Sequence, residues 1–288
     1  MSDQPSREVR NLNALLDVAK ALGAEMQLDN LLPVIISKTT EVIDAERSSL
    51  FIYDEETNEM WSKVAEGMDS KEIRFPVGVG IAGDVAKTLK TVNIPDAYKD
   101  NRFNPAFDKE TNYRTKSILC MPMLNNEGAL VGVVQVLNKK DGSTFDDKDE
   151  SLLEALSVQA GVAIQRARLL EAFVEKQRIQ ESLKLAADIQ MGMLPKDFPA
   201  FPDRDDFDLF ASIIPAKEVG GDFYDFFLID DDHLCFVIGD VSGKGVPAAL
   251  FMAVTKTHVA ASTIPGIEPS DILIRANDEL CKENDQGM

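Results

Sequence analysis

A stretch of chain with almost no glycine or proline is the feature that most constrains the fold. From Phe145 to Met193 there is no proline, and the glycines are Gly161 and Gly192. Because these two residue types disfavour helix interiors most strongly, their near absence predicts one long helix. Apolar residues recur within it at alternating spacings of three and four, the pattern of a coiled-coil seam: Leu153, Leu156, Ala160, Ala163, Ala167, Leu170 and Val174.

Two interpretations of this helix are open from the sequence. It can cover the domain that precedes it, or its apolar stripe can pair with the same helix of a second chain. The stripe is longer than one small domain needs, so we expect a homodimer through residues 151–190. Both interpretations can also hold, each for a different half of the helix. The seam breaks at Gln177-Arg178 and resumes at Ile179, and such a break changes the local winding of a coiled coil.

Segments that read as strands lie on both sides of the long helix. Before it, two helical segments, the second beginning near Asn30, precede strand-like runs at 48–54, 60–67, 71–77, 90–96, 115–123 and 129–139. Several connections are short, which favours antiparallel pairing. After it, the patterns predict strands at 207–216, 222–230 and 233–241, and helices at 247–261 and 269–284.

The excess of acidic residues disfavours two classes of binding partner. With 30 Lys+Arg and 49 Asp+Glu, the formal net charge is −19, which disfavours nucleic acid and anionic membranes because both require a basic face. No apolar run approaches the roughly 20 residues of a membrane-spanning helix, and the N-terminus MSDQPSREVR has no signal-peptide core. Three scattered cysteines and two histidines favour a cytoplasmic location and a chemistry that depends on carboxylates.

The string GVGIAG at 78–83 matches the G-x-G-x-x-G pattern of dinucleotide sites. A dinucleotide site also requires a βαβ unit with a parallel sheet, and Pro76 in the preceding strand and the short turns after it disfavour that arrangement. What remains is a helix that begins at Gly80-Ile81-Ala82-Gly83, whose free N–H groups can hold one phosphate.

A second signal is NKKDGSTFDDKDE at 138–150, with Asn138-Lys139, then Phe145, then three residues, then Asp149-Glu150. Together with SSLFIYD, NIPDAYKDNRF and YRTKSILCMPM, this pattern resembles the cyclic-nucleotide-binding GAF domains of phosphodiesterases and bacterial adenylate cyclases, over about residues 10–170. We interpret Lys139 and Asp149 as an ion pair that ties the strand end to the following helix, and not as ligand contacts.

The resemblance implies a set of ligand-binding residues. The ring phosphate would lie on the backbone N–H groups of Ile81 and Ala82, and further contacts are implied for Ser49, Ala65, Glu66, Thr111, Thr115 and Gln135. Some relatives carry an aromatic residue at the position of Ala65 and a carboxylate at that of Gln135. Because this sequence differs at both positions, it leaves open which base the domain recognises. We favour cyclic AMP over cyclic GMP.

Two acidic strings stand beside glycines after the long helix. EVGGDFYDFF at 218–227 and VIGDVSGKGVPAALFMA at 237–253 place Asp222 and Asp240 at ends of apolar runs. A P-loop is disfavoured, because GDVSGKG has three residues between its outer glycine and Gly-Lys, and Gly245 replaces the magnesium-binding Ser/Thr. Oxygen ligands without usable histidines suit Mn²⁺ or Mg²⁺, and a metal pair can activate water for attack on phosphate.

These strings, with AADIQMGMLP and IRANDEL, resemble the beginning of SpoIIE-like metal-dependent phosphoserine/threonine phosphatases of the PPM type, over about 186–288. The resemblance implies Asp222 and Asp240 as catalytic metal carboxylates and the carbonyl of Val241 as a backbone ligand, with Asp225 a weaker candidate. Relatives continue with further strands and two more aspartates. We therefore expect the chain as given to be inactive, with its two-metal site completed by residues that it lacks.

Taken together, the sequence predicts an α+β protein with a sensor, a transmitter and an effector. The expected parts are a GAF domain at 1–150 with an antiparallel sheet flanked by helices, a coiled-coil helix at 151–190, and the N-terminal part of an α/β/β/α PPM fold at 191–288. The expected function is a cyclic-nucleotide-regulated phosphatase that acts on a phosphoprotein such as an anti-sigma-factor antagonist. The alternative is a non-catalytic nucleotide-sensing dimer whose degenerate phosphatase fold serves as a docking module.

Overall fold

The computed structural model describes residues 7–62, 73–215 and 217–282. The chain divides into two compact units, Met1–Val174 and Glu175–Met288, and we describe each unit by itself. The division falls inside the helix α5 (Asp147–Gly192), which is 46 residues long. The glycine- and proline-poor stretch therefore forms one continuous helix, as its composition predicts.

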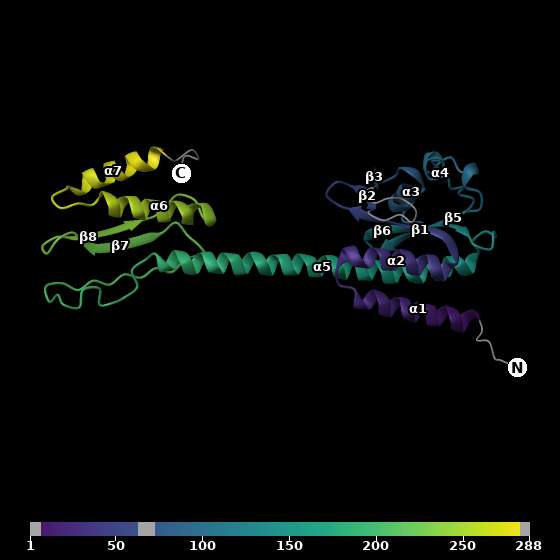
Figure 1. Ribbon diagram of the computed structural model, residues 1–288, viewed down its shortest axis with the longest axis horizontal. Helices are drawn as coiled ribbons and strands as arrows, with labels where there is room; N and C mark the ends of the chain where they lie inside the picture. Colours follow the sequence, from purple (N-terminus) through teal and green to yellow (C-terminus); the bar gives the residue numbers. More distant parts are fainter. Residues whose placement is uncertain (1–6, 63–72, 216, 283–288) are drawn as a thin grey trace. The chain divides into compact units, whose positions relative to one another are not determined.

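An antiparallel sheet of six strands forms the centre of the N-terminal unit (Figure 1). Its order is β3-β2-β1-β6-β5-β4, and every neighbouring pair is antiparallel. The strands are β1 (Ala45–Asp54), β2 (Glu59–Ser62), β3 (Ile73–Pro76), β4 (Val92–Ile94), β5 (Ile118–Leu124) and β6 (Leu130–Lys139). The predicted antiparallel GAF-type sheet with flanking helices is thus confirmed.

Helices cover both faces of this sheet. The helices α1 (Arg7–Ala24) and α2 (Leu28–Ile43) and the first half of α5 enclose a core with Leu50, Ile52, Val134 and Val136 of the central strands. On the opposite face lie α3 (Gly80–Thr88), the short 3-10 helix η1 (Ala97–Lys99) and α4 (Ala106–Thr111). Because successive side chains of a strand point to opposite faces, β1 and β6 contribute to both layers.

The apolar seam of α5 has two different environments. Leu153, Leu156 and Ala160 are almost fully buried in the core of the N-terminal unit, so this half of the helix covers its own domain. Further along the seam, Val174 is 57% exposed and Ile179 is 52% exposed. The described helices include none that is long and apolar enough to cross a membrane.

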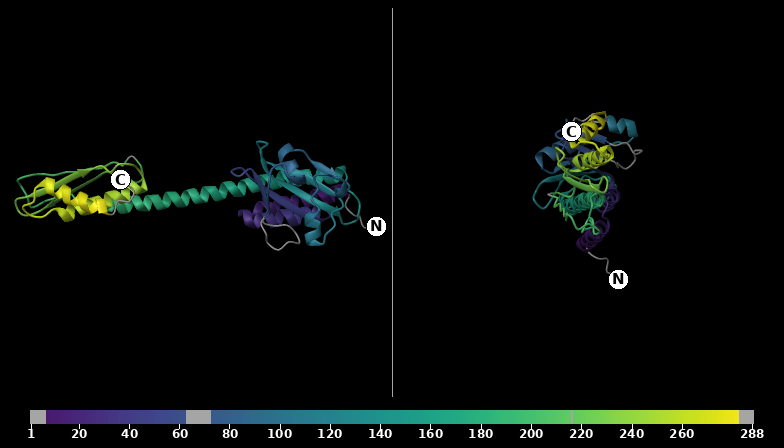
Figure 2. Two further views of the ribbon diagram at one scale, coloured as in Figure 1. Left: turned by 90° about the horizontal axis from the view of Figure 1, so that it is seen from above. Right: turned by 90° about the vertical axis from the view of Figure 1, so that its left-hand side faces the viewer.

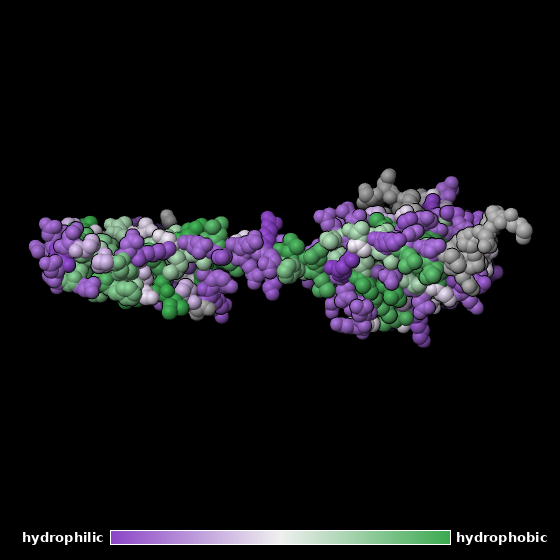
Figure 3. Space-filling model, turned by 90° about the horizontal axis from the view of Figure 1, so that it is seen from below, coloured by the Kyte–Doolittle hydropathy of each residue, from purple (hydrophilic) through white to green (hydrophobic). Residues whose placement is uncertain are grey.

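Apolar side chains are also exposed on the side of the N-terminal unit that Figure 3 shows. The helix α1, which lies on this side in Figure 1, exposes Leu12 and Leu16 by 60% and 51%. An α-helix with an apolar stripe ordinarily buries it against another element.

In the C-terminal unit, β7 (Phe223–Leu228) and β8 (Leu234–Gly239) form an antiparallel hairpin. The helices α6 (Val246–Ser262) and α7 (Pro269–Lys282) lie along one side of it (Figure 2), and Phe223, Val241 and Met252 share a small buried core. The strand predicted at 207–216 is wrong within the described residues, because 207–215 pair with no strand. Apolar residues there satisfied the strand pattern, but a strand also requires a neighbour for its backbone groups.

Gly161 provides a test of how α5 packs on the sheet. A Cβ atom added there would overlap the backbone carbonyl of Leu124 at the end of β5, whereas one at Gly23 in α1 of the same unit would meet nothing within 4 Å. Alanine raises helix propensity at both sites. We therefore expect Gly161→Ala to lower the free energy of unfolding by about 1–3 kcal/mol through overpacking and Gly23→Ala to be neutral or stabilising. The fluorescence of Trp61, the single tryptophan, reports urea unfolding of this unit, and equal effects of the two variants would contradict the tight packing.

Candidate ligand cavity and carboxylate pair

A cavity of about 540 Å³ lies on the α3 and α4 face of the sheet. Every site residue predicted for this domain that the structure describes lines it: Ser49, Ile81, Ala82, Thr111, Thr115 and Gln135. Ala65 and Glu66 lie outside the described residues. Residues from β1, β3, α3, α4, β5 and β6 all contribute, so the cavity exists only in the folded domain.

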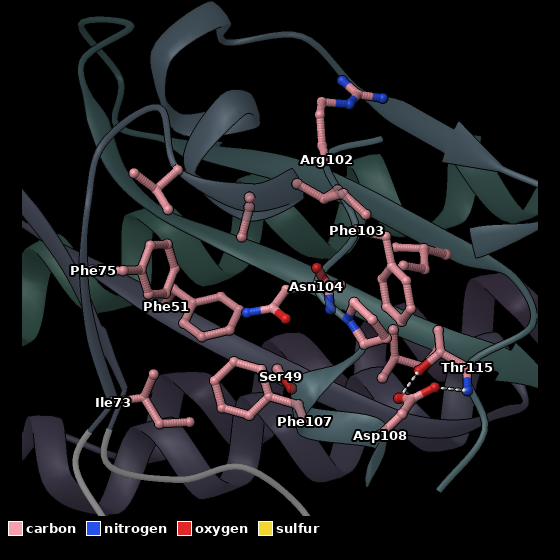
Figure 4. A pocket seen from close by; sticks show the side chains of 18 of the residues that line it. Ser49, Phe51, Ile73, Phe75, Arg102, Phe103, Asn104, Phe107, Asp108 and Thr115 are labelled. Atoms are coloured by element: carbon pink, nitrogen blue, oxygen red, sulfur yellow. Dashed lines mark hydrogen bonds between the residues drawn. The ribbon is translucent and has the colours of Figure 1, made fainter. Parts of the chain in front are cut away.

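The sheet supplies the floor of the cavity. Ser49 on β1 and Gln135 on β6 are direct cross-strand partners, so their side chains lie side by side on the same face. Aromatic rings of β1 and β3 border them, and Phe51 of β1 meets Phe75 of β3 edge to face with ring centroids 5.1 Å apart. Figure 4 shows these rings together with Phe107 of α4 around the open space. The floor therefore combines two polar groups with a flat apolar border.

The beginning of α3 provides hydrogen-bond donors. The first N–H groups of a helix have no partner within the helix, and Val79 at the N-cap makes no side-chain capping bond. Gly80 has φ +69°, in the left-handed region that favours glycine, and the N–H of Gly78 donates to the carbonyl of Gly83 over 2.8 Å. The GVGIAG loop therefore shapes a helix start at which Ile81 and Ala82 line the cavity, as an anion site requires.

The segment around α4 is held by Asp108, which the sequence analysis missed. This buried carboxylate accepts bonds from the N–H and the hydroxyl of Thr115, both over 2.7 Å, and from the hydroxyl of Tyr98 over 2.9 Å (Figure 4). The hydroxyl of Thr111 donates to the carbonyl of Phe107. Both threonine hydroxyls therefore donate to groups of the protein, and Thr111 is the last residue of α4.

Asn138, Lys139 and Asp149 of the pattern at 138–150 form a structural network outside the cavity lining. Lys139 and Asp149 make an ion pair of 2.8 Å with only 10% and 4% of their side chains exposed, which confirms the predicted tie between β6 and α5. The amide of Asn138 donates to Glu46 and to the carbonyl of Arg114, and its oxygen accepts the N–H groups of Lys116 and Ser117. These residues are absent from the cavity lining.

Arg47, Tyr113 and Asn104 also line the cavity, and the sequence analysis did not identify them. Arg47 lies over the ring of Tyr113 at 3.9 Å, and the hydroxyl of Tyr113 donates to Glu46 over 2.8 Å. Burial and this carboxylate raise the pKa of Tyr113 above its ordinary value. Asn104 also lines the cavity, and its side-chain oxygen accepts the N–H of Ala106 at the start of α4. Their proximity arises from contacts between distant segments, which sequence spacing does not reveal.

Asp222 and Asp240 are brought together in the C-terminal unit. Phe223 pairs with Gly239 at the end of the hairpin, so the two aspartates stand opposite each other just beyond it. Both are exposed, and Asp240 raises the pKa of Asp222, first through a hydrogen bond between the two carboxyl groups, which requires a proton on one of them, and second through the repulsion of two negative charges side by side. Val241 is buried, and its N–H donates to the carbonyl of Gly221 over 3.3 Å.

The carboxylate pair suits part of a metal site. A divalent cation would relieve the repulsion between Asp222 and Asp240, and Mg²⁺ is often held by one or two carboxylates with water completing its shell. Among the described residues, no group of three or more His, Cys, Asp or Glu that could hold a metal occurs. Asp225, the weaker candidate, is buried and pairs with Lys256 of α6 over 2.6 Å, so its carboxylate is engaged by a cation of the protein.

Two family models match the chain. Residues 27–164 match the GAF domain, and residues 230–288 match stage II sporulation protein E (SpoIIE). The fold agrees with the first match, since a GAF domain from a phosphoenolpyruvate-protein phosphotransferase of Coxiella burnetii superposes with a TM-score of 0.52 at 22% identity over 58% of this chain and 99% of that one. The N-terminal unit therefore has the fold of a GAF domain, and residues 230–288 are similar to SpoIIE.

The curated relatives share the N-terminal part. A probable 3′,5′-cyclic phosphodiesterase of Caenorhabditis elegans is 35% identical over 192 residues, which cover 62% of this chain and 25% of that protein. A dual 3′,5′-cyclic-AMP and -GMP phosphodiesterase of Takifugu rubripes is 38% identical over 169 residues, 54% of this chain and 19% of that protein. The chain thus spans a quarter or less of the length of these relatives.

The buried ion pair can be tested by removing its cation. Lys139→Met removes the cation that pairs with the buried Asp149, whose carboxylate keeps the bond from the N–H of Asp146, and we expect a loss of about 3–5 kcal/mol in the free energy of unfolding. Lys140→Met is the matched control, because Lys140 is 54% exposed and 3.8 Å from Asp44, an arrangement worth about 0–1 kcal/mol. Urea unfolding followed by Trp61 fluorescence measures both, and a small effect of Lys139→Met would show that the pair is dispensable.

Proposed function

We propose that the GAF domain binds a 3′,5′-cyclic nucleotide and that this binding regulates a metal-dependent phosphoserine/phosphothreonine phosphatase. The observation that supports the first part most is the cavity, where donors at the start of α3 lie beside a floor of Ser49 and Gln135 with an aromatic border. Its volume falls in the range of about 300–1,000 Å³ typical of small-molecule sites. Relatives named as cyclic phosphodiesterases support the ligand class.

The chemistry of the cavity suits the two ends of such a ligand. The N–H groups at Ile81 and Ala82 suit the single charge of the ring phosphate, since a helix N-terminus stabilises an anion without a cationic side chain. Aromatic rings such as Phe51 and Phe75 suit the faces of a purine, and Gln135 can donate or accept at the base edge. We retain cyclic AMP over cyclic GMP as the proposed ligand.

Titration calorimetry tests the ligand. We expect one cyclic nucleotide to bind per chain with micromolar or better affinity. Phe75→Ala should weaken binding by about tenfold, because stacking on an aromatic ring contributes about 1–3 kcal/mol per base. Phe198→Ala is the control, since Phe198 belongs to the C-terminal unit, and it should bind as the unaltered protein does. Flat titrations with both cyclic AMP and cyclic GMP would refute this part of the proposal.

The phosphatase part rests on the SpoIIE match and on the juxtaposition of Asp222 and Asp240. With Mn²⁺ or Mg²⁺ bound, such a site supplies an activated water and neutralises charge on the phosphoryl group. In this chain the two carboxylates would hold the cation, and the buried Val241 would present its carbonyl at the turn after β8. A phosphoprotein, with an anti-sigma-factor antagonist as the candidate, is the proposed substrate.

Phosphatase activity of the full-length protein tests this part. We expect Mn²⁺-dependent release of phosphate from a phosphoserine protein, and a loss of at least about a hundredfold in Asp222→Asn or Asp240→Asn, as for removal of a group that stabilises transition-state charge. Asp231→Asn, an exposed acid in the β7–β8 turn, should leave the rate unchanged. Equal rates in all three variants would refute the metal role of the pair.

A non-catalytic docking module is the second candidate. It is favoured by the finding that the described residues assemble only a pair of acidic ligands and no group of three. A full-length protein that binds cyclic nucleotide but releases no phosphate with either Mn²⁺ or Mg²⁺ would support this alternative.

For the regulatory link, we propose a homodimer through the exposed second half of the predicted 151–190 helix, because the first half is buried in its own domain. Polar bonds attach α5 to the sensor, since the guanidinium of Arg166 donates to the carbonyls of Leu22 and Glu25, and that of Arg168 donates to the carbonyl of Tyr53. Just beyond this attachment the helix exposes Phe173 and Ile179. A shift of the sensor would therefore be passed directly to the surface that we propose as the dimer contact.

Light scattering tests the dimer. Phe173→Asp with Ile179→Asp should convert a dimer to a monomer, because two charges would be buried at the contact. Gln180→Asp, an exposed polar position of the same helix, should leave the dimer intact. A monomeric unaltered protein at micromolar concentration would refute the dimer.

A further inference from the structure

Arg102 is a cation that lines the ligand cavity and pairs with two carboxylates of the protein. It lies in the loop between η1 and α4. Its Nη1 is 2.6 Å from Asp84 of α3, its Nη2 is 2.7 Å from Asp100, and its Nε donates to Asp100 over 2.9 Å. Its own backbone N–H also donates to Asp100 over 2.9 Å. These are bidentate, charge-assisted bonds, the strong class of side-chain hydrogen bond.

The charge of Arg102 is therefore not available for a phosphate. Two carboxylates surround one guanidinium, and its bonds to Asp100 lower the pKa of that acid below the ordinary value. Figure 4 shows the guanidinium pointing away from the other labelled side chains of the cavity. An arginine beside a proposed phosphate site would ordinarily be taken as the phosphate ligand, and this geometry argues against that role.

Arg102 joins two parts of the cavity wall, the helix α3 and the loop that leads into α4. Asp84 is in the second turn of α3, whose first turn carries Ile81 and Ala82. The backbone carbonyl of Arg102 itself lies 4.0 Å from the position that a Cβ of Gly80 would occupy. Asn104 and Phe107, further along the same loop and α4, also line the cavity. The arginine therefore fastens the start of α3 to the segment that leads into α4.

We propose that Arg102 is a positioning residue, which aims the first-turn N–H groups of α3 at the ring phosphate by clamping Asp84 and Asp100, without touching the ligand. This inference rests on the proposed binding of a cyclic nucleotide. Its physical basis is that hydrogen bonds weaken steeply with misalignment, so a helix start that can pivot loses affinity for the phosphate and not for the base.

The two roles of Arg102 predict opposite signs for a change at Asp84. If Arg102 were a direct phosphate ligand, Asp84→Ala would release its charge and tighten binding. If Arg102 positions α3, Asp84→Ala removes one side of the clamp and weakens binding. The double variant with Arg102→Met should then be no weaker than either single variant, because both remove the same clamp.

The experiment measures affinities for cyclic AMP, cyclic GMP and the corresponding nucleosides. We expect Arg102→Met and Asp84→Ala each to weaken the better cyclic nucleotide by about tenfold, the cost of about one misaligned bond to a charged group, and to leave nucleoside binding unchanged. Arg102→Lys keeps the charge without the planar fork and should recover only part of the loss. Lys90→Met, an exposed cation just after α3, controls for net charge and should bind normally. Tighter binding by Asp84→Ala, or equal losses for nucleosides and nucleotides, would overturn the proposal.

An arm without ligand separates this inference from the proposed function. In the ligand-free protein, Arg102→Met and Asp84→Ala should speed hydrogen exchange of the amides at 80–84 by about tenfold, with the strands of the sheet unchanged. If no cyclic nucleotide binds the unaltered protein, the proposed function fails, while faster exchange at 80–84 still supports the clamp. Unchanged exchange in both variants would overturn the clamp whatever the ligand.

Discussion

Side-chain alternation across the paired strands β1 and β6 is the constraint on which the N-terminal unit depends. Leu50 and Ile52 pack into the core with α2 and α5, whereas Ser49 and Phe51 face the cavity. Because successive residues of a strand point to opposite faces, one register serves both layers, and a slip by one residue would exchange core and cavity. The ligand cavity and the helix α5 are therefore built on opposite faces of the same two strands.

Charged side chains in this unit chiefly fix the backbone. Lys139 and Asp149 join β6 to α5, Asp108 holds the chain at Thr115, and Arg102 joins α3 to the loop before α4. Each charge has a partner of the opposite sign or several hydrogen-bond donors, as partly buried charges require. At the start of α3 the cavity offers backbone N–H groups, and the rest of its lining combines neutral polar groups and aromatic rings with Arg47, which lies over the ring of Tyr113. This arrangement suits a ligand with a single negative charge.

The C-terminal unit shows the same separation of roles among its acids. Asp225 lies within β7 and is neutralised by Lys256 of α6, so it contributes to the packing of that helix. Asp222 and Asp240 stand beyond the ends of β7 and β8, where the chain turns at Gly221 and Val241. A hydrogen bond between their carboxyl groups and their mutual repulsion raise the pKa of Asp222. A pair of acids that repel each other at an exposed position is the kind of arrangement that a bound cation stabilises.

Local periodicity in the sequence determined the long helix, the antiparallel sheet, the hairpin of β7 and β8 and the glycine-shaped start of α3, because these depend on near neighbours. The family resemblance located six residues that line the cavity. The tertiary structure alone decided which apolar run gains a strand partner, since 207–215 match the pattern but pair with no strand. It also decided that Asp108 and Arg102 hold the cavity wall, because hydrogen bonds between distant segments form only after the sheet and helices have brought them together.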